Sequence, residues 1–399
     1  MEKTKNIVAK TGNEAFAEGM RQINPDVVAA YPITPATEIV QIFSQFVADG
    51  LVDTEFVAVE SEHSAMSACI GASASGARAM TGTSSQGLAL MWEMLYIASG
   101  LRLPIVMAVV NRTLSSPINI HCDHSDTFGA RDSGWIQIYS ENVQETYDNI
   151  FQALRIAEHP DVKLPAMVTT DGFILSHCLE TLEILTDEQV KEFIGIPPER
   201  DNLIKSLIEN KPITIGALDL QDYYFEHKRQ QAEGMKNALK IIPEIGKEFG
   251  DKFGRYYGFF EEYKLDDAEV GIVIIGSTTG TAKEVVDQMR KEGKKVGLLK
   301  LRVYRPFPAE EIAKVLSKLK VLGVVERVEG MSGFVSPLYS EISSSLYHYE
   351  KRPTLVNFVY GLGGRDVKLE DIRDIFDELL KISSTGKKEF TLKYIGVRE

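Results

Sequence analysis

The stretch Val57-Ala58-Val59-Glu60-Ser61-Glu62-His63-Ser64-Ala65 leads from an apolar, strand-like run through two carboxylates into a segment of helical character. Small residues follow at close intervals up to Ala77, and residues of this size let a second backbone or a flat ring come close. Two interpretations of the carboxylates are open. They are surface charge at the start of a helix, which the helix dipole favours, or one of them is shielded from water and available for acid–base chemistry.

The first half of the chain alternates between short apolar runs and amphipathic runs. The apolar runs predict strands at Val27–Tyr31, Glu55–Val59, Ala79–Thr83, Ile105–Val110 and Ala166–Thr170. The amphipathic runs predict helices at Glu14–Met20, Glu38–Asp49, Ser64–Ser75, Gln86–Gly100 and Val143–Glu158. This alternation predicts an α/β fold with a parallel sheet that helices cover on both faces. Ligands of such sheets bind beside the carboxyl ends of the strands, which is where Glu60 and Glu62 stand.

The pattern divides the chain into two α/β domains, residues 1–190 and 268–399, joined by a connecting and docking segment at 191–267. The connecting segment contains a long amphipathic stretch, which we expect Pro243 to kink or interrupt. Strands of the second domain are predicted at Val270–Gly276, Lys295–Arg302, Val321–Glu326 and Thr354–Tyr360. Its helices are predicted at Thr281–Glu292, Pro308–Leu319, Val335–Tyr347 and Leu369–Ile382.

Composition and charge narrow the class of protein. The chain has 399 residues, 25% charged and 44% hydrophobic, which is ordinary for a soluble globular protein. Its net charge of −13 argues against a surface that binds nucleic acid or anionic membranes. The N-terminus lacks the apolar core of a signal peptide, and the longest apolar run, Ile105 to Val110, is too short to cross a bilayer. We therefore expect a cytoplasmic protein.

The number and spacing of the cysteines are also typical of a cytoplasmic protein. Cys69, Cys122 and Cys178 are odd in number and far apart, so they predict no disulfide framework. The sequence contains no Cys-x-x-Cys, so we expect no iron–sulfur cluster bound by this chain itself.

Polar side chains follow two further predicted strands. In the turn Tyr31-Pro32-Ile33-Thr34-Pro35, Thr34 could cap the next helix, or its hydroxyl and nearby N–H groups could face an anion above the sheet. Arg112 follows the strand Ile105–Val110 and offers a planar fork for a carboxylate, although a structural salt bridge is the alternative.

Other motifs carry weaker signals. The loop His121-Cys-Asp-His-Ser-Asp126 holds residue types that ligate metals, but a second ligand cluster is not evident, so a structured active-site loop is favoured. The segment Gly276–Lys283 lacks the ending of a P-loop, and Gly361-Leu-Gly-Gly364 lacks the spacing of a dinucleotide loop. Tight turns explain both.

Taken as a set, seven motifs resemble one family over nearly the whole chain. They are Tyr31–Pro35, Glu60–Ala65, Asn111-Arg112, the loop 121–131, Leu301–Pro308, Glu326–Gly330 and Tyr360–Arg365. In this order they resemble the alpha subunit of the pyruvate:ferredoxin oxidoreductases (pyruvate synthases), within the 2-oxoacid:ferredoxin oxidoreductases. The resemblance implies a pyrimidine-type thiamine-diphosphate-binding domain followed by a transketolase C-terminal-like domain.

The resemblance also implies partners and cofactors. Thiamine diphosphate would be shared with a beta subunit, while Mg²⁺ and [4Fe-4S] clusters would lie on partner subunits and no metal on this chain. Beta, gamma and delta subunits, ferredoxin, pyruvate and coenzyme A are the expected partners and substrates. The chain is not expected to turn over alone.

By similarity, Glu62 is the catalytic carboxylate that hydrogen-bonds the aminopyrimidine ring of the cofactor, with Glu60 as the competing candidate. Tyr31 and Pro32 would also contact the cofactor, and Thr34 and Arg112 would hold the substrate. One cation and one hydroxyl suit a small monoanion, so pyruvate is favoured over 2-oxoglutarate and oxalate. Two alternatives stay open: another 2-oxoacid such as 2-oxobutyrate, and a non-catalytic scaffold subunit.

Overall fold

The computed structural model describes residues 6–398, and its largest sheet has seven strands. Their order is β12-β6-β7-β5-β4-β2-β3, and all pairs are parallel except β12 with β6. The strands span Val27–Ala30 (β2), Glu55–Ala58 (β3), Ala79–Thr83 (β4), Val106–Asn111 (β5), Ile136–Tyr139 (β6), Ala166–Asp171 (β7) and Val303–Arg305 (β12). The five predicted strands are confirmed within one residue at each end. The structure adds β6 and β12, which the sequence analysis did not predict.

Helices cover both faces of this sheet, as the apolar strands require. They are α1 (Gly12–Ile23), α2 (Thr37–Ala48), α3 (Glu62–Ala74), α4 (Ser85–Leu90), α5 (Trp92–Gly100), α6 (Ser125–Gly129) and α7 (Val143–Glu158). Phe16 and Phe151 lie in the core on one face, and Met66 and Leu95 in the core on the other. The prediction of one helix over Gln86–Gly100 is wrong, because the helix divides at Met91.

The second domain is a six-stranded sheet in the order β15-β14-β13-β10-β11-β9. Its strands span Phe260–Tyr263 (β9), Val270–Ile275 (β10), Val296–Leu301 (β11), Val321–Glu326 (β13), Thr354–Tyr360 (β14) and Leu392–Ile395 (β15). Helices α11 (Thr278–Lys291), α12 (Ala309–Leu316), α13 (Pro337–Leu346) and α14 (Leu369–Thr385) pack on its faces. All the strands and helices predicted for this domain are present. The short edge strands β9 and β15 are additions.

The connecting segment contains α8 (Asp187–Ile194), α9 (Leu203–Ile208) and the 30-residue helix α10 (Tyr224–Phe253). Helix α10 continues through Pro243, so the predicted interruption is wrong. Its apolar face, with Ile242 and Phe249, packs into the core of the first domain. A two-stranded sheet of β1 (Asn6–Lys10) and β8 (Glu180–Ile184) completes the first domain. The domain limits stay a prediction, and β12 crosses them by returning to the first sheet.

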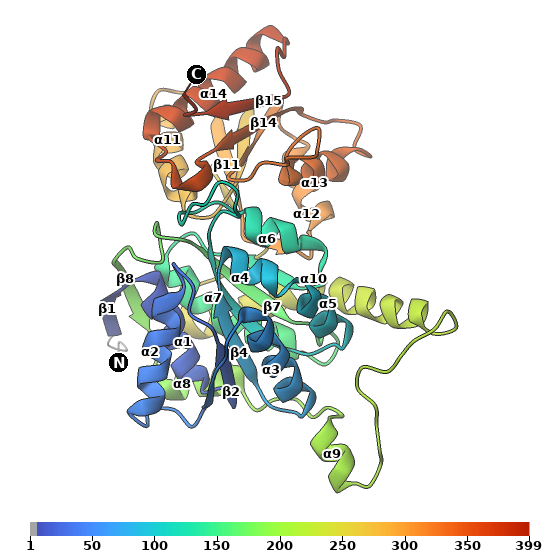
Figure 1. Ribbon diagram of the computed structural model, residues 1–399. Helices are drawn as coiled ribbons and strands as arrows, with labels where there is room; N and C mark the ends of the chain where they lie inside the picture. Colours follow the sequence, from blue (N-terminus) through green and yellow to red (C-terminus); the bar gives the residue numbers. More distant parts are fainter. Residues whose placement is uncertain (1–5, 399) are drawn as a thin grey trace.

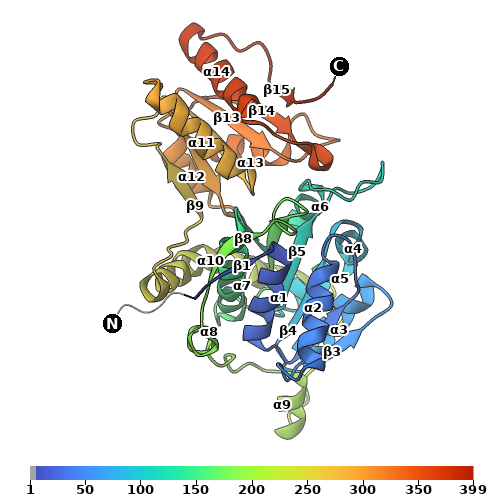
Figure 2. The same cartoon turned by 90° about the vertical axis from the view of Figure 1, so that its left-hand side faces the viewer.

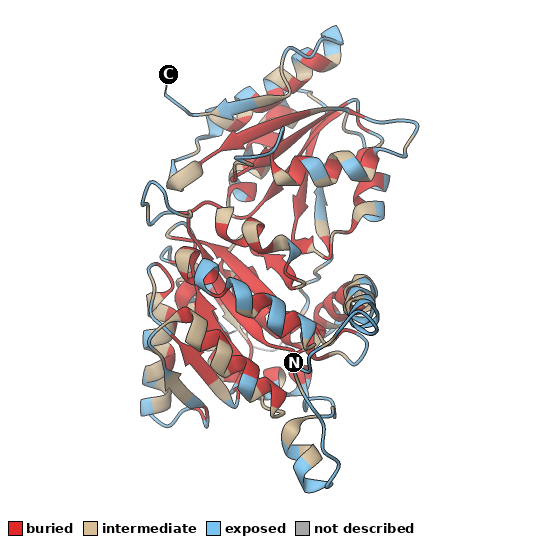
Figure 3. Ribbon diagram, turned by 45° about the vertical axis from the view of Figure 1, so that its right-hand side comes forward, coloured by how far each residue is buried: buried red, intermediate tan, exposed pale blue. Residues whose placement is uncertain are grey.

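The two domains lie one above the other, with α6 between them and α9 at the far end of the first domain (Figure 1). The view turned by 90° shows the same stacking (Figure 2). The central strands of both sheets are buried along their length (Figure 3). Across residues 6–398, the structure contains no helix with the length and apolar character that a membrane span requires.

Candidate functional site at the carboxyl edge of the first sheet

Glu62 lies in the first turn of α3, directly after β3, and is only 5% exposed. The Ser61 side chain caps this helix by accepting a hydrogen bond from the Ser64 N–H. Within the described part of the chain, the Glu62 carboxylate has no hydrogen-bond or ion-pair partner. A buried carboxylate without a partner is costly. Such a group is therefore available to a ligand.

Glu60 has a different environment. It is exposed, and the Ser64 hydroxyl donates a hydrogen bond to its carboxylate, which lowers the pKa of that carboxyl. The structure thus separates the two carboxylates by burial and by partner. This supports Glu62 rather than Glu60 as the ligand-binding carboxylate.

Three residues after or near β4 form the surroundings of Glu62, and the sequence analysis did not identify them. The hydroxyl oxygens of Thr83 and Ser84 are buried without a hydrogen-bond partner in the described structure. A Cβ atom built at Gly87 would lie 2.4 Å from Thr83 Oγ1 and 2.6 Å from Glu62 Oε1. Unpartnered hydroxyls and a glycine packed against the carboxylate form a close-packed polar cluster whose hydrogen-bonding groups are not satisfied within the described structure. The only sequence signal was the Ser-Ser-Gln-Gly run after a predicted strand.

The contact at Gly87 yields a prediction for Gly87→Ala. The added methyl group would displace the Glu62 carboxylate, so we expect roughly tenfold or greater loss of turnover in the assembled protein. Gly71→Ala, on the exposed side of the same helix α3, is the matched control because nothing lies within 4 Å of its Cβ position. We expect that control to retain activity and to be slightly more stable, by about 0.5–1 kcal/mol. Equal activity of both variants in steady-state assays would contradict the proposed close fit.

Arg112 and Thr34 meet directly at the ends of β5 and β2. Arg112 Nη1 donates to the Thr34 carbonyl at 2.9 Å, and Nε donates to the Asn119 carbonyl at 2.9 Å. The alternative of a structural salt bridge is wrong, because Arg112 pairs with no carboxylate side chain among residues 6–398. Its Nη2 group is left without a protein partner. The guanidinium is therefore held by neutral acceptors, with its charge uncompensated and one donor group spare.

The turn that carries Thr34 is exposed. The alternative that Thr34 caps α2 is wrong, because the cap position is Ala36 and no side chain caps this helix. Among residues 6–398 the Thr34 hydroxyl has no hydrogen-bond partner, and Tyr31 and Pro32 are exposed on the same turn. The structure brings Tyr31, Pro32, Thr34 and Arg112 to one edge, with Glu62 after the neighbouring strand β3.

Asp126 joins these strand ends and was missed as a site residue. Its carboxylate accepts hydrogen bonds from the backbone N–H groups of Ser85 (3.1 Å), Arg112 (3.0 Å) and Thr127 (2.8 Å). It also accepts one from the Asn111 side-chain amide at 2.9 Å. Burial raises the pKa of this carboxyl to about 6. One buried carboxylate thus fixes the backbone beside both Glu62 and Arg112.

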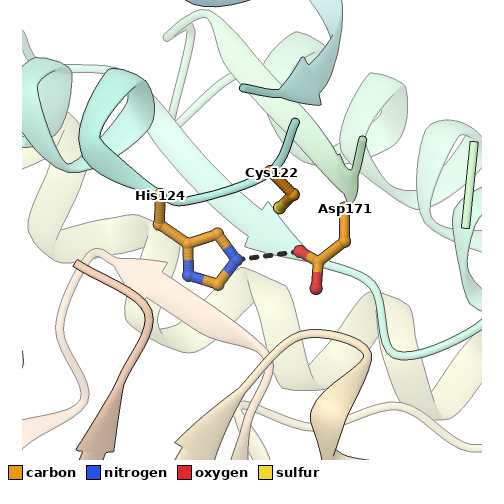
Figure 4. Close-up of side chains that lie close together, drawn as sticks. All are labelled: Cys122, His124 and Asp171. Carbon is orange, nitrogen blue, oxygen red and sulfur yellow. Dashed lines mark hydrogen bonds and ion pairs between the residues drawn. The ribbon is translucent and has the colours of Figure 1, made fainter. Parts of the chain in front are cut away.

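A second buried group lies in the same loop. Cys122, His124 and Asp171 place a sulfur, a nitrogen and an oxygen within 4.8 Å of one another, and His124 Nε2 lies 2.8 Å from Asp171 Oδ1 (Figure 4). The sequence shows no second ligand cluster near this loop, whereas in the structure Asp171 at the end of β7 supplies the third residue. However, Arg327 Nη1 lies 3.9 Å from Asp171 Oδ2, and burial raises the pKa of the Cys122 thiol well above its usual range. The internal guanidinium beside Asp171 and the close His124–Asp171 pair favour an ion-pair network over a metal site.

A family model described as "Pyruvate flavodoxin/ferredoxin oxidoreductase, thiamine diP-bdg" matches residues 18–247, and one described as "Pyruvate:ferredoxin oxidoreductase core domain II" matches residues 268–372. The pyruvate synthase subunit PorA of Thermotoga maritima is 54% identical over 399 residues, covering 100% of both chains. The PorA subunit of Methanocaldococcus jannaschii is 46% identical, again over 100% of both chains. The ketoisovalerate oxidoreductase subunit VorA of Pyrococcus abyssi is 43% identical over 97% of each chain.

Solved structures agree on the fold. The 2-oxoglutarate:ferredoxin oxidoreductase of Magnetococcus marinus matches with a TM-score of 0.72 at 22% identity, covering 94% of this chain and 66% of that chain. A split-gene transketolase matches with a TM-score of 0.54 at 12% identity, covering 94% of this chain and 99% of that one. These comparisons confirm the predicted fold class and the resemblance noted in the sequence. The chain belongs to the pyruvate flavodoxin/ferredoxin oxidoreductase family, and residues 18–247 form its thiamine-diphosphate-binding part.

Proposed function

We propose that this chain is the alpha subunit of a pyruvate synthase, which interconverts pyruvate and coenzyme A with acetyl-CoA and CO₂ and exchanges electrons with ferredoxin. The observation that carries the proposal is the buried, unpartnered Glu62 within the thiamine-diphosphate-binding part of the chain. The 54% identity to a pyruvate synthase subunit over the full length supports the same substrate.

The residues around Glu62 fit the aminopyrimidine half of thiamine diphosphate. A flat, hydrogen-bonding ring needs polar partners, and the carboxylate of Glu62 and the hydroxyl of Thr83 both lack one within the described structure. When bound, thiamine diphosphate supplies a nucleophilic carbon and an electron sink for loss of CO₂. Glu62 would hold a proton at a ring nitrogen, and Tyr31 and Pro32 would line the approach to the ring.

Arg112 and Thr34 would bind the 2-oxoacid. The spare Nη2 donor of Arg112 suits the substrate carboxylate, and the Thr34 hydroxyl suits the adjacent carbonyl. The Tyr31–Pro35 turn offers no second cation, so a monocarboxylate is preferred over a dicarboxylate. The ketoisovalerate oxidoreductase subunits at 43% and 42% identity make a branched 2-oxoacid the closest rival to pyruvate.

The remaining machinery would lie on other chains. We propose that a beta subunit binds the diphosphate with Mg²⁺, and that beta and delta subunits carry [4Fe-4S] clusters, with a gamma subunit completing the assembly. The curated relatives are named as subunits, which supports assembly with partner chains.

The test is to purify the native complex, identify its subunits and cofactors, and measure acceptor reduction with a panel of 2-oxoacids. The panel contains pyruvate, 2-oxobutyrate, 3-methyl-2-oxobutyrate, 2-oxoglutarate and oxalate. We expect kcat/KM to be highest for pyruvate by about tenfold over the branched acid, the scale that extra methyl groups produce in a small pocket. A higher value for 3-methyl-2-oxobutyrate or for a dicarboxylate would contradict the substrate assignment.

A further inference from the structure

We propose that Asp171 is a positioning residue through which the second domain holds the substrate-binding Arg112 in place. The inference rests on the proposed function, because it assigns to Arg112 the 2-oxoacid carboxylate. It concerns the segment of residues 112–126, called here the Arg112 loop. This loop leaves the end of β5, runs between the domains and returns at α6 (Figure 1).

Asp171 bridges the two domains. Its Oδ1 contacts His124 Nε2 of the Arg112 loop at 2.8 Å. Its Oδ2 accepts hydrogen bonds from Ser277 of the second domain, from the N–H at 3.1 Å and the hydroxyl at 2.5 Å. Although burial opposes ionisation, the charges of His124 and Arg327 hold the pKa of this carboxyl well below its usual range. A charged carboxylate therefore ties the loop to the second sheet.

The turn of the second domain that reaches Asp171 is built for close approach. Gly276 has a φ of +80°, and a Cβ there would lie 3.0 Å from both carboxylate oxygens of Asp171. The residues of the second domain that reach this loop all follow the carboxyl ends of strands: Ser277 follows β10, Arg327 follows β13, and the Gly361–Gly364 turn follows β14. The carboxyl ends of the two sheets therefore face each other across the Arg112 loop.

The second domain holds the Arg112 loop at three more points, two of them on the backbone of the loop. The His124 N–H donates to the Arg327 carbonyl at 2.9 Å, and the Gly364 N–H donates to the Cys122 carbonyl at 2.7 Å. The Asn119 side-chain amide donates to the Gly363 carbonyl at 3.0 Å. Because these bonds involve the backbone, the loop cannot shift without breaking them.

The same loop fixes the guanidinium. The side-chain amide of Asn119 binds the second domain, and its backbone carbonyl accepts a hydrogen bond from Arg112 Nε at 2.9 Å. The Thr113 N–H bonds the His121 carbonyl at 3.0 Å and closes the loop on itself. Asp171 holds His124, and two residues further along the chain the Asp126 carboxylate accepts a hydrogen bond from the Arg112 N–H at 3.0 Å. Arg112 is thus tied to the second domain both through this end of the loop and through Asn119. Small displacements of a substrate-orienting group lower activity strongly, so release of Asp171 should impair use of the 2-oxoacid.

The experiment is Asp171→Asn in the full complex, assayed with the 2-oxoacid that the wild-type complex uses best. Asparagine has the same size as aspartate and can still accept a hydrogen bond from Ser277. It carries no negative charge, so its interaction with His124 is weaker. We expect KM for the 2-oxoacid to rise about tenfold and kcat to change less than about threefold. Amide hydrogen exchange of residues 113–124, measured by mass spectrometry, should become faster, and the affinity for thiamine diphosphate should stay the same.

Asp148→Asn is the matched control. Asp148 is an equally buried carboxylate on α7 that accepts hydrogen bonds from Arg255 and Tyr257. Among residues 6–398 it has no hydrogen bond or ion pair with the Arg112 loop. This control should lower thermal stability without changing KM. If the Asp171→Asn complex does not assemble, Ser277→Ala makes the same test, because it removes the hydroxyl that donates a hydrogen bond to Asp171. We then expect a smaller rise in KM, of about two- to fivefold.

The outcomes separate this inference from the proposed function. Unchanged KM and unchanged exchange of residues 113–124 would overturn the role of Asp171, as would an equal rise in KM for Asp148→Asn. A wild-type complex that uses no 2-oxoacid would overturn the proposed function instead. The exchange measurement would still report whether Asp171 holds the loop.

Discussion

Glu62→Gln in the assembled complex is expected to lower kcat for pyruvate oxidation by about 10²–10⁴-fold, the scale of a lost general acid–base group. Glutamine keeps the shape of the side chain, but it cannot hold and release a proton at the cofactor's ring nitrogen. Glu62 is buried and has no protein partner in the described structure, so removal of its charge breaks no internal bond. We therefore expect thermal stability and subunit assembly to be unchanged or slightly improved.

Glu60→Gln is the matched control for this variant. It makes the same chemical change two residues away, at an exposed carboxylate that accepts a hydrogen bond from Ser64. We expect turnover within about twofold of wild type, because exposed polar contacts contribute little. If Glu60→Gln lost activity and Glu62→Gln kept it, the two roles would have to be exchanged.

Arg112→Ala should raise KM for pyruvate about 100-fold, with a smaller effect on kcat. The substitution would remove the proposed charge-assisted contact to the substrate carboxylate, and such a contact is worth roughly 1.5–3 kcal/mol. It also removes the bonds to the Thr34 and Asn119 carbonyls and so loosens the Arg112 loop. Arg112→Lys should give an intermediate KM, because lysine keeps the charge but not the planar fork. Steady-state kinetics over a range of pyruvate concentrations measures both variants.

Arg102→Ala is the control for the structural part of this effect. Arg102 also donates to backbone carbonyls, those of Val162, Lys163 and Gln230, but it precedes β5 at the opposite edge of the sheet. We expect Arg102→Ala to lower thermal stability and leave KM for pyruvate unchanged. An unchanged KM in Arg112→Ala would remove Arg112 from the substrate site.

The sequence predicted the parts of the site that local pattern controls. Continuous apolar runs located β2, β3 and β5, and Thr34, Glu62 and Arg112 stand just after them. Because these strands run parallel in one sheet, with only β4 between β5 and β2, their carboxyl ends had to meet at one edge. The family resemblance then distinguished Glu62 from Glu60, and the observed burial supports that choice.

The parts that were missed depend on contacts between distant segments. Asp126 acquires its role from N–H groups of Ser85 and Arg112, and Asp171 acquires its role from Ser277 of the second domain. The hydrophobic periodicity of a sequence does not indicate contacts between distant segments. Strand β6 was missed because the polar Gln137 interrupts it, although its amide is buried and donates to the Thr127 carbonyl at 2.8 Å. Tertiary packing also keeps α10 helical through Pro243, against the local preference.

The central claim is that this chain contributes a catalytic half-site and does not only scaffold its partners. The most direct measurement compares pyruvate-dependent, coenzyme A-dependent ferredoxin reduction in three samples: the partner subunits alone, with the wild-type chain, and with the Glu62→Gln chain. We predict turnover only with the wild-type chain, while thiamine diphosphate and subunit content are the same in both assembled samples. Comparable turnover by the partner subunits alone, or by the Glu62→Gln assembly, would contradict the claim.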